Sequence, residues 1–323
     1  MVRGPQEAFV EVIRTNTSLL RRIVHNENLV IENTTVGKIS KTAVAICYMK
    51  NIANDRLISE VKYRINNLDV DYLISSGELE QLIQDNGRLA VPQIIATERP
   101  DRVATNLLSG RVAVLVNGSP YALVMPGILV DYLSSPEDMN SKHQFSNLLK
   151  LVRLIALFFS LLLPGIYIAI SNYHHEFIPT ELVFAIVASR ESVPFPIIFE
   201  IILMELSFEL IREAGVRTPS VLGTTIGIVG ALILGEAAVS ANVVSPILII
   251  IVAITGICSF AVPDFSLSFS IRIYRFIYIL LAYTAGLLGI AIRFIFSICY
   301  ILKFEVFWCK LFSFFFRNEP FFN

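Results

Sequence analysis

The chain has 323 residues, of which 54% are hydrophobic, and 26 basic and 27 acidic residues give it a formal net charge of −1 at pH 7. Its mean hydropathy of +0.65 excludes a chain that is soluble throughout. The near-neutral charge excludes the strongly basic surface typical of nucleic-acid-binding domains. The first 150 residues hold 16 of the basic and 16 of the acidic residues. The composition therefore predicts a soluble first half and a membrane-embedded second half.

Residues 1–140 alternate between strand-like and helix-like patterns. Short runs rich in β-branched residues predict strands at residues 29–36, 39–49, 93–97, 112–116 and 121–125. Apolar residues at helical spacing predict helices at residues 55–68, 73–83 and 101–109. The pattern predicts a mixed α/β soluble domain.

The next region, residues 141–292, is predicted to be an all-α membrane domain with about five spans or re-entrant segments. Its long apolar stretches are residues 154–170, 195–211, 221–239, 244–262 and 273–292. A shorter stretch, residues 182–189, is expected to be interfacial or re-entrant. Pro194 and Pro196 follow it and are expected to break the helix before the next span.

Basic residues predict the orientation of these spans. If the first domain is cytosolic, the same side of the membrane receives Lys150, Arg153, Arg212, Arg217, Arg272 and Arg275. The loops expected on the other side carry no Lys or Arg, in agreement with the positive-inside rule. Arg190 is an exception, and a local pair with Glu191 would lower the cost of placing it there. Residues 1–28 lack the apolar core of a signal peptide, which also favours a cytosolic first domain.

Three carboxylates, Glu200, Glu205 and Glu209, lie within the otherwise apolar run 196–211. A charge in hydrocarbon costs about 3 kcal/mol or more, so it usually faces a protein interior or water. Two interpretations remain open. The acids line a polar path or pair between subunits, or the segment lies at the cytosolic interface with its acids in water. A local pair between Glu209 and Arg212 is also expected.

Residues 221–239 present two different faces. Small residues at every fourth position predict close helix packing at Gly223, Gly227, Ala231 and Gly235. Beside them lie Thr225, Leu232 and Glu236, which would form hydroxyl, aliphatic and carboxylate layers in a ring of such helices. An aliphatic layer can gate by dewetting, and an acidic ring favours cations. The alternative is that both faces only pack against other spans.

The sequence holds no motif of an enzyme. His174-His175-Glu176 lacks the spacing of a zinc-binding HExxH helix, and neither GxSxG nor a Ser/His/Asp arrangement can be singled out. The four cysteines are scattered without a CxxC pair, which predicts reduced, buried thiols. We therefore expect no catalytic activity, no cofactor and no metal site.

Several long blocks resemble a known family. In the second half they are RESVPFP, LMELSFELIREAG, GIVGALILGEAAV, VSPILIIIVAITGICSFAVP and IRIYRF. In the first half they are VRGPQEAFVEVIRTN, TERPDRVA, NGSPYALVMP and SPED. Because these blocks are long and occur in the same order, residues 2–292 resemble the A subunits of GerA-type spore germination receptors.

The resemblance implies a membrane subunit of a nutrient-responsive receptor in the spore inner membrane, with its soluble domain on the cytosolic (core) side. It implies a homo-oligomer of A subunits, in contact with membrane lipid, that forms a gated path for monovalent cations. It also implies a transporter-like B subunit that senses nutrients and a C subunit that is a lipoprotein. Glu200, Glu205, Glu209, Thr225, Leu232 and Glu236 are the candidates for the pore or polar seam.

Residues 293–323 differ from the family and form an atypical tail that holds 10 of the 23 phenylalanines. Family members continue here into another membrane stretch, and they carry a further soluble region before the first block. We therefore expect a truncated member. The alternatives are a secondary transporter subunit, for which the helix break would be suited, and an inactive receptor fragment.

Overall fold

The computed structural model describes residues 4–87, 90–217, 227, 230, 233–303, 305–306 and 309–310. The chain divides into two compact units, one of residues 1–150 and 299–323 and the other of residues 151–298. Each unit is described by itself. The expected order of an α/β region followed by a helical region is confirmed.

The first unit is built on a five-stranded antiparallel sheet of strand order β1-β2-β4-β5-β3. Its strands are β1 (Leu29–Val36), β2 (Thr42–Met49), β3 (Ile95–Thr97), β4 (Val112–Val116) and β5 (Ala122–Met125). Every residue of β4 and β5 is buried, which explains their uninterrupted apolar sequences. The predicted strand at residues 39–49 begins three residues late, because Lys41 has a positive φ of 45° and Ile39 lies exposed in the turn.

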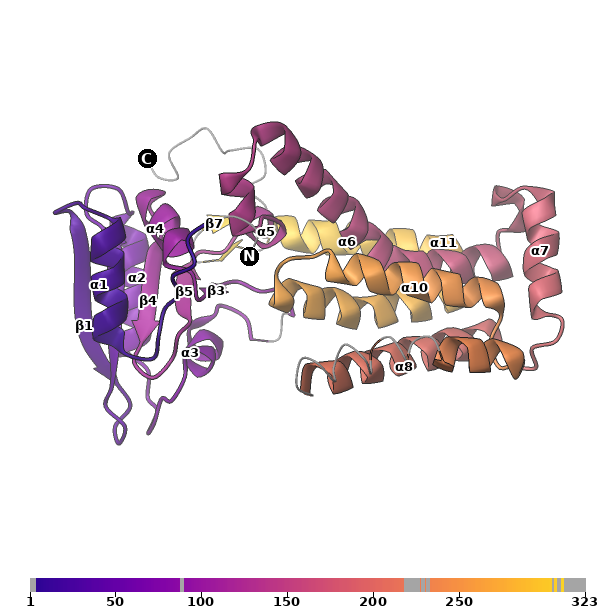
Figure 1. Ribbon diagram of the computed structural model, residues 1–323, viewed down its shortest axis with the longest axis horizontal. Coiled ribbons are helices and arrows are strands. Elements are labelled where there is room, and N and C mark those ends of the chain that lie inside the picture. The colour runs from indigo at the N-terminus through magenta and orange to yellow at the C-terminus, as the bar shows by residue number, and fades with distance from the viewer. Residues whose placement is uncertain are drawn as a thin grey trace. The chain divides into compact units, whose positions relative to one another are not determined.

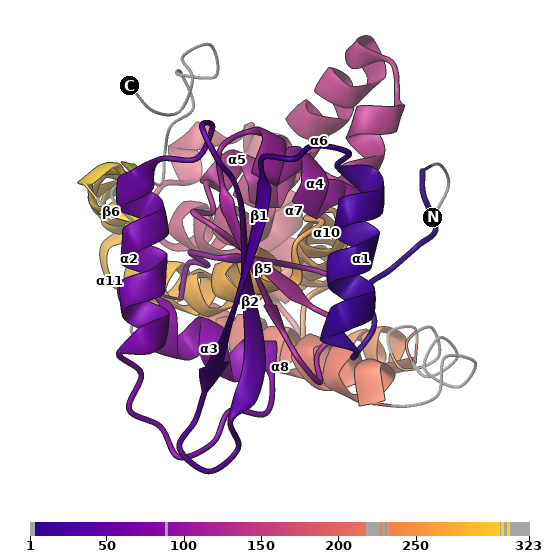
Figure 2. The same cartoon turned by 90° about the vertical axis from the view of Figure 1, so that its left-hand side faces the viewer.

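Helices cover both faces of this sheet, as the edge-on view in Figure 2 shows for α1 and α2. The helices of the unit are α1 (Ile13–Ile23), α2 (Asp55–Asn66), α3 (Ser76–Ile83), α4 (Pro100–Leu108), α5 (Leu129–Leu133) and the 3-10 helix η1 (Pro136–Asn140). α1 and α4 pack against each other and against β2 and β4, whereas α2 contacts α3 and β1. The sequence patterns predict α2, α3 and α4 but not α1. The short strands β6 (Glu305–Val306) and β7 (Cys309–Lys310) form a separate pair.

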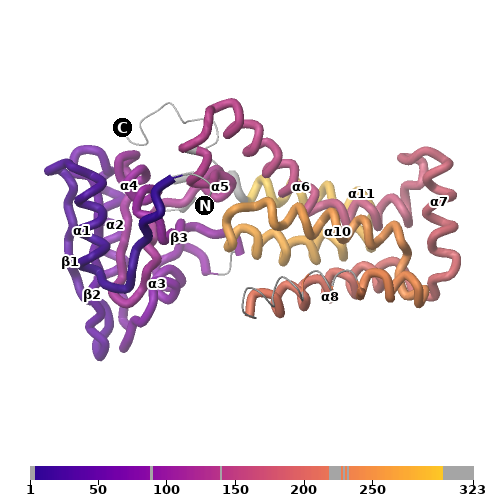
Figure 3. Tube along the Cα trace, in the orientation of Figure 1, coloured from indigo at the N-terminus to yellow at the C-terminus, as the bar shows by residue number. Residues whose placement is uncertain are grey.

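The second unit is helical. The helices of this region are α6 (His143–Asn172), α7 (Thr180–Arg190), α8 (Ile197–Arg217), α10 (Pro246–Phe260) and α11 (Phe265–Lys303). Figures 1 and 3 show α8, α10, α11 and the later part of α6 with nearly parallel axes, and α7 lying across their end. The 3-10 helix η2 (His175–Phe177) joins α6 to α7. α11 contains one non-helical residue, Gly286, whose φ is +60°.

Two of the described helices are long and apolar enough to cross a membrane, namely His143–Asn172 and Phe265–Tyr300. This is fewer than the five spans or re-entrant segments expected. α8 has the length but carries too many charges to qualify, and α10 is apolar but has only 15 residues. Most of the stretch 221–239 lies outside the described residues, although residues 233–240 are helical.

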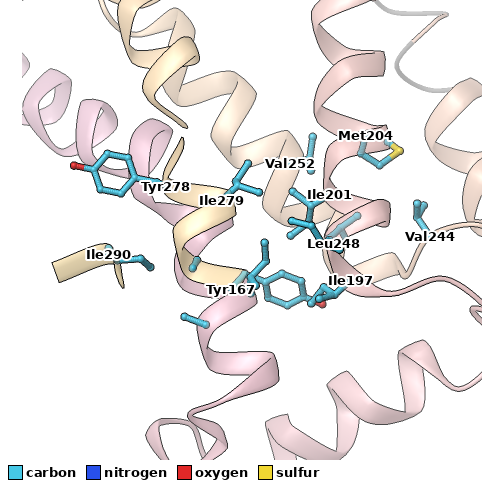
Figure 4. Close-up of a cluster of buried hydrophobic side chains, with 14 residues drawn as sticks. Tyr167, Ile197, Ile201, Met204, Val244, Leu248, Val252, Tyr278, Ile279 and Ile290 are labelled. Carbon is cyan, nitrogen blue, oxygen red and sulfur yellow. The ribbon is translucent and has the colours of Figure 1, made fainter. Parts of the chain in front are cut away.

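The core of the helical unit joins α6, α8, α10 and α11. Figure 4 shows Tyr167 of α6 beside Ile197 and Ile201 of α8 and Leu248 of α10, and Ile279 of α11 belongs to the same cluster. On α8, the buried residues Ile197, Ile201 and Met204 recur at helical spacing and place one face of the helix inward. This same face carries two of the three acids.

Candidate functional site

The three acids of α8 form three layers along the helix, and each contacts at least one arginine. Glu200 and Glu205 are fully buried, with exposed fractions of 1% and 0%, whereas the side chain of Glu209 is 23% exposed. Their spacing of five and four residues places them on neighbouring turns of one helix. We call these contacts the acid–arginine layers.

The first layer joins α7, α8 and the start of α10. The Oε1 atom of Glu200 accepts hydrogen bonds from Nε and Nη2 of Arg190 at 3.3 and 3.2 Å. Its Oε2 atom accepts one at 3.0 Å from the backbone N–H of Ser245, the residue before α10. The carboxylate therefore lies at a helix N-terminus, where the backbone dipole favours negative charge. The expected pair of Arg190 with Glu191 is wrong, because the buried Glu200 holds the guanidinium instead.

The second layer joins α6, α8 and α11. Nη1 of Arg275 donates to Oε2 of Glu205 at 2.5 Å. The same guanidinium donates from Nε to the backbone oxygen of Ser160 at 2.7 Å and from Nη2 to its hydroxyl at 2.9 Å. Arg275 is 1% exposed, so this pair is closed to solvent. Oε1 of Glu205 is buried and has no hydrogen-bond partner among the described residues.

The third layer joins α8, α10 and α11. Oε2 of Glu209 accepts a hydrogen bond from Nη1 of Arg272 at 2.8 Å, and Arg212 lies 3.5 Å from its Oε1. Arg212 also donates to the hydroxyl of Ser259 at 2.5 Å and lies over the rings of Phe208 and Phe260. The expected pair of Glu209 with Arg212 is confirmed, but Arg272 is the closer partner.

The sequence left two interpretations of the three acids open, and the contacts within this single chain bear on both. The expectation that the acids lie in water is wrong for Glu200 and Glu205, which are desolvated. Their partners come from the same chain, so they need no second subunit for charge compensation. Removing one member of such a buried pair costs about 3–5 kcal/mol, because it leaves a charge without compensation in a low-dielectric interior.

Sequence reasoning missed the roles of Arg272 and Arg275, which it placed among the charges flanking the membrane on the cytosolic side. In addition, Arg275 is buried and Arg272 is nearly so, and both pair with acids of α8. A signal for the pairs was present. Arg272 and Arg275 are three residues apart and Glu205 and Glu209 four apart, so each set occupies one helix face.

Several other candidates lie outside these layers. Gly223, Thr225 and Leu232 are outside the described residues. Glu236 is exposed. A Cβ added to Gly227 would meet no described atom within 4 Å, and one added to Gly235 would meet only Ile249, at 3.9 Å. Pro194 and Pro196 lie in the non-helical connection between Arg190, the last residue of α7, and Ile197, the first of α8.

The expectations on cysteine and metal sites can be compared only over the described residues. Within these, no group of three or more His, Cys, Asp or Glu side chains could hold a metal ion. Cys47 is buried as expected, but Cys299 is exposed, so the expectation of buried thiols is wrong there. The TERPDR block forms a local pair, since Arg99 Nη2 lies 2.6 Å from Asp101 Oδ2 at the start of α4.

The comparisons with known proteins agree with the resemblance. The family described as Bacillus/Clostridium GerA spore germination protein matches residues 1–320. Spore germination protein KA of Bacillus subtilis is 42% identical over 94% of this chain and 56% of its own length. Spore germination protein A1 of the same organism is 43% identical over 90% of this chain and 60% of its own length. The chain therefore spans about three fifths of these relatives.

A solved structure is also similar in sequence. It is the N-terminal domain of the A subunit of the Bacillus megaterium spore germinant receptor GerK3, 43% identical, covering 36% of this chain and 94% of that domain, with a TM-score of 0.31.

Proposed function

Since the chain belongs to the GerA family of spore germination proteins, we propose that it acts as the A-type membrane subunit of a nutrient-responsive germination receptor. In this proposal, the helical region at residues 141–292 lies in the spore inner membrane and the α/β region at residues 1–140 lies on the cytosolic (core) side. Copies of the chain assemble into a ring that conducts monovalent cations, together with a B and a C subunit.

The main support for the proposal comes from the acid–arginine layers, which lie inside a helical unit with an apolar exterior. Because their charges are compensated within the chain, Glu200 and Glu205 act as a scaffold of the polar seam rather than as ligands for a passing ion. The conducting surface then belongs to another element. Exposed Glu236 is the candidate, because a carboxylate on an apolar helix in a membrane requires water or a protein partner.

In the proposed ring, Thr225, Leu232 and Glu236 face the ion path, and Gly223, Gly227 and Gly235 allow neighbouring helices to approach. Leu232 forms the aliphatic constriction, which resists hydration in the closed state. Nutrient binding elsewhere in the receptor opens the path only if it favours the open state over the closed one. Such a subunit performs no catalysis and needs no cofactor.

A secondary transporter is the second candidate. The observation that favours it is the interruption between α7 and α8 at Pro194 and Pro196, because transporters use broken helices at their binding sites. The two functions differ in their flux. A transporter shows saturable substrate dependence without unitary currents, whereas the proposed path conducts ions in unitary steps.

The test of the proposed path uses Leu232→Ala and Glu236→Gln in the full-length receptor. We expect Leu232→Ala to release monovalent cations without nutrient, since a smaller side chain lowers the barrier to hydration. Glu236→Gln should weaken the preference for cations over anions. Leu234→Ala, an exposed apolar position two residues away, is the matched control. Unchanged ion release and selectivity in normally assembled receptors would place the path on another element.

A further inference from the structure

A cavity of about 650 Å³ is lined by the end of α6, the segment that follows it and α7. α7 crosses the end of the bundle (Figure 1). One wall consists of residues of α7, among them Val183, Phe184 and Val187, and the opposite side includes Ser171 and His175. Arg190 and Glu191, at the end of α7, complete the lining. The cavity is thus apolar over most of α7 and charged at one end.

α7 exposes apolar side chains both in the cavity lining and at Leu182, which lies outside it. None of its residues is buried, and the exposed fractions of Leu182, Phe184 and Val187 are 50%, 70% and 60%. A helix that exposes such side chains and lies across the end of membrane-spanning helices is suited to the boundary between lipid head groups and acyl chains. The molecules that meet this cavity at the highest concentration are therefore phospholipids.

The charged end of the cavity is fixed in position. Arg190 is held by the fully buried Glu200, which is itself bound to the N-terminus of α10, yet the side chain of Arg190 remains 25% exposed. Glu191 follows it in the chain and also lines the cavity. A positive and a negative group therefore both line this end of the cavity, where a ligand can reach them.

Unsatisfied hydroxyl groups lie behind this end. The hydroxyls of Tyr167, Ser171 and Ser245 are buried and have no hydrogen-bond partner among the described residues. The three hydroxyls lie close to one another, near Arg190 and Glu200, but the geometry between them is too poor for well-formed hydrogen bonds. Buried hydroxyls without partners cost free energy, so a ligand or water that accepts their hydrogen bonds is favoured.

We propose that this cavity binds a zwitterionic phospholipid with a primary ammonium group, such as phosphatidylethanolamine. Its phosphate lies toward Arg190 and Ser171, its ammonium group donates to Glu191, and an acyl chain lies along Val183 and Val187. A metal cation fits less well because of the guanidinium, and a purely anionic head group is disfavoured by Glu191. The inference uses the membrane location in the proposed function but is independent of ion conduction.

The experiment uses the full chain in phosphatidylcholine nanodiscs containing a small fraction of photoactivatable lipid. We expect photoactivatable phosphatidylethanolamine to label the peptide that spans α7 about fivefold more than the phosphatidylcholine or phosphatidylglycerol analogue does, which corresponds to one exposed ion pair. Glu191→Gln should abolish this preference for the ethanolamine head group. Because the readout is lipid labelling, a receptor without ion conduction would still give a valid result.

Two matched variants distinguish lipid binding in the cavity from lipid contact elsewhere on the surface. Val187→Trp fills the cavity and should lower labelling by phosphatidylethanolamine to the level of the other lipids. Leu182→Trp, on the same helix but outside the lining, should leave it unchanged. Size-exclusion profiles identify any variant that fails to fold. Equal labelling by all three lipids, or full competition by water-soluble glycerophosphoethanolamine, would overturn the proposal.

Discussion

The two units of the chain distribute polar and apolar side chains in opposite ways. In the first unit, the sheet strands β4 and β5 are buried and apolar, while ion pairs such as Lys62–Glu32 lie partly in solvent. In the helical unit, the arginine and the carboxylate of the pair Arg275–Glu205 are both buried. Apolar side chains such as Leu288 are 70% exposed there. The difference agrees with the proposed function, in which water surrounds the first unit and lipid surrounds the helical unit.

The largest expected effect is the loss of a buried charge partner. Arg275→Met should destabilise the helical unit by about 3–5 kcal/mol, because it leaves Glu205 charged and without compensation. The readout is the amount of folded full chain recovered from membranes and its thermal unfolding. Arg217→Met is the matched control, since the pair of Arg217 with Glu213 is largely exposed and contributes less than about 1 kcal/mol.

Combining Arg275→Met with Glu205→Met should restore much of the stability, because no buried charge then remains. If the single and the double variant were equally unstable, the packing of the long side chains rather than their charges would hold the helices together.

A second comparison concerns leucines in the two units. Leu115→Ala in β4 should lower the free energy of unfolding of the α/β unit by about 2–5 kcal/mol, because Leu115 is 1% exposed and its removal leaves a cavity. Leu280→Ala in α11, where the side chain is 54% exposed, should change thermal unfolding of the full chain in nanodiscs much less. Similar losses at both positions would indicate that Leu280 is covered by protein.

Thiol reactivity tests whether solvent reaches the buried side chains of the sheet. Burial raises the pKa of Cys47 to about 12, so almost no thiolate exists at pH 8 and iodoacetamide should not modify it in the folded chain. Modification should follow unfolding in denaturant. A cysteine placed at the exposed position Ile39 should react without denaturant. Rapid modification of Cys47 under native conditions would show that the sheet opens readily.

The smallest effect is expected at the surface of the first unit. Hydrogen bonds from Lys62 and Tyr48 lower the pKa of Glu32 below its usual 4.5. The stability contributed by this group is therefore complete above pH 4.5 and is lost as the pH falls through the lowered value. Lys62→Met should return the pKa of Glu32 toward 4.5 in an NMR titration and change stability at pH 7 by less than about 1 kcal/mol. An unchanged pKa would assign the shift to Tyr48 alone.

The sequence predicted the elements of the sheet better than the ion pairs of the bundle. The strands β1 and β4 have the predicted ends, since runs of β-branched residues bounded by turns are local signals. The partner of Arg190 could not be predicted, because Glu200 reaches it only through the turn after α7. The same holds for Arg275, whose pairing depends on how α11 packs against α8. The charges near the ends of apolar segments predicted a membrane topology, but they did not predict these tertiary contacts.

The two ion pairs between α8 and α11 also fix how these helices are aligned along their axes. Glu205 meets Arg275 and Glu209 meets Arg272, so the partners run in opposite order along the two helices. If α11 slid by one turn, about 5.4 Å, so that Arg275 met Glu209, then Glu205 would be left buried and uncompensated. Sliding the other way would carry Arg275 into the apolar face around Ile201. A single alignment therefore neutralises both acids, so we expect α8 and α11 to move together as one rigid body in any rearrangement of the bundle.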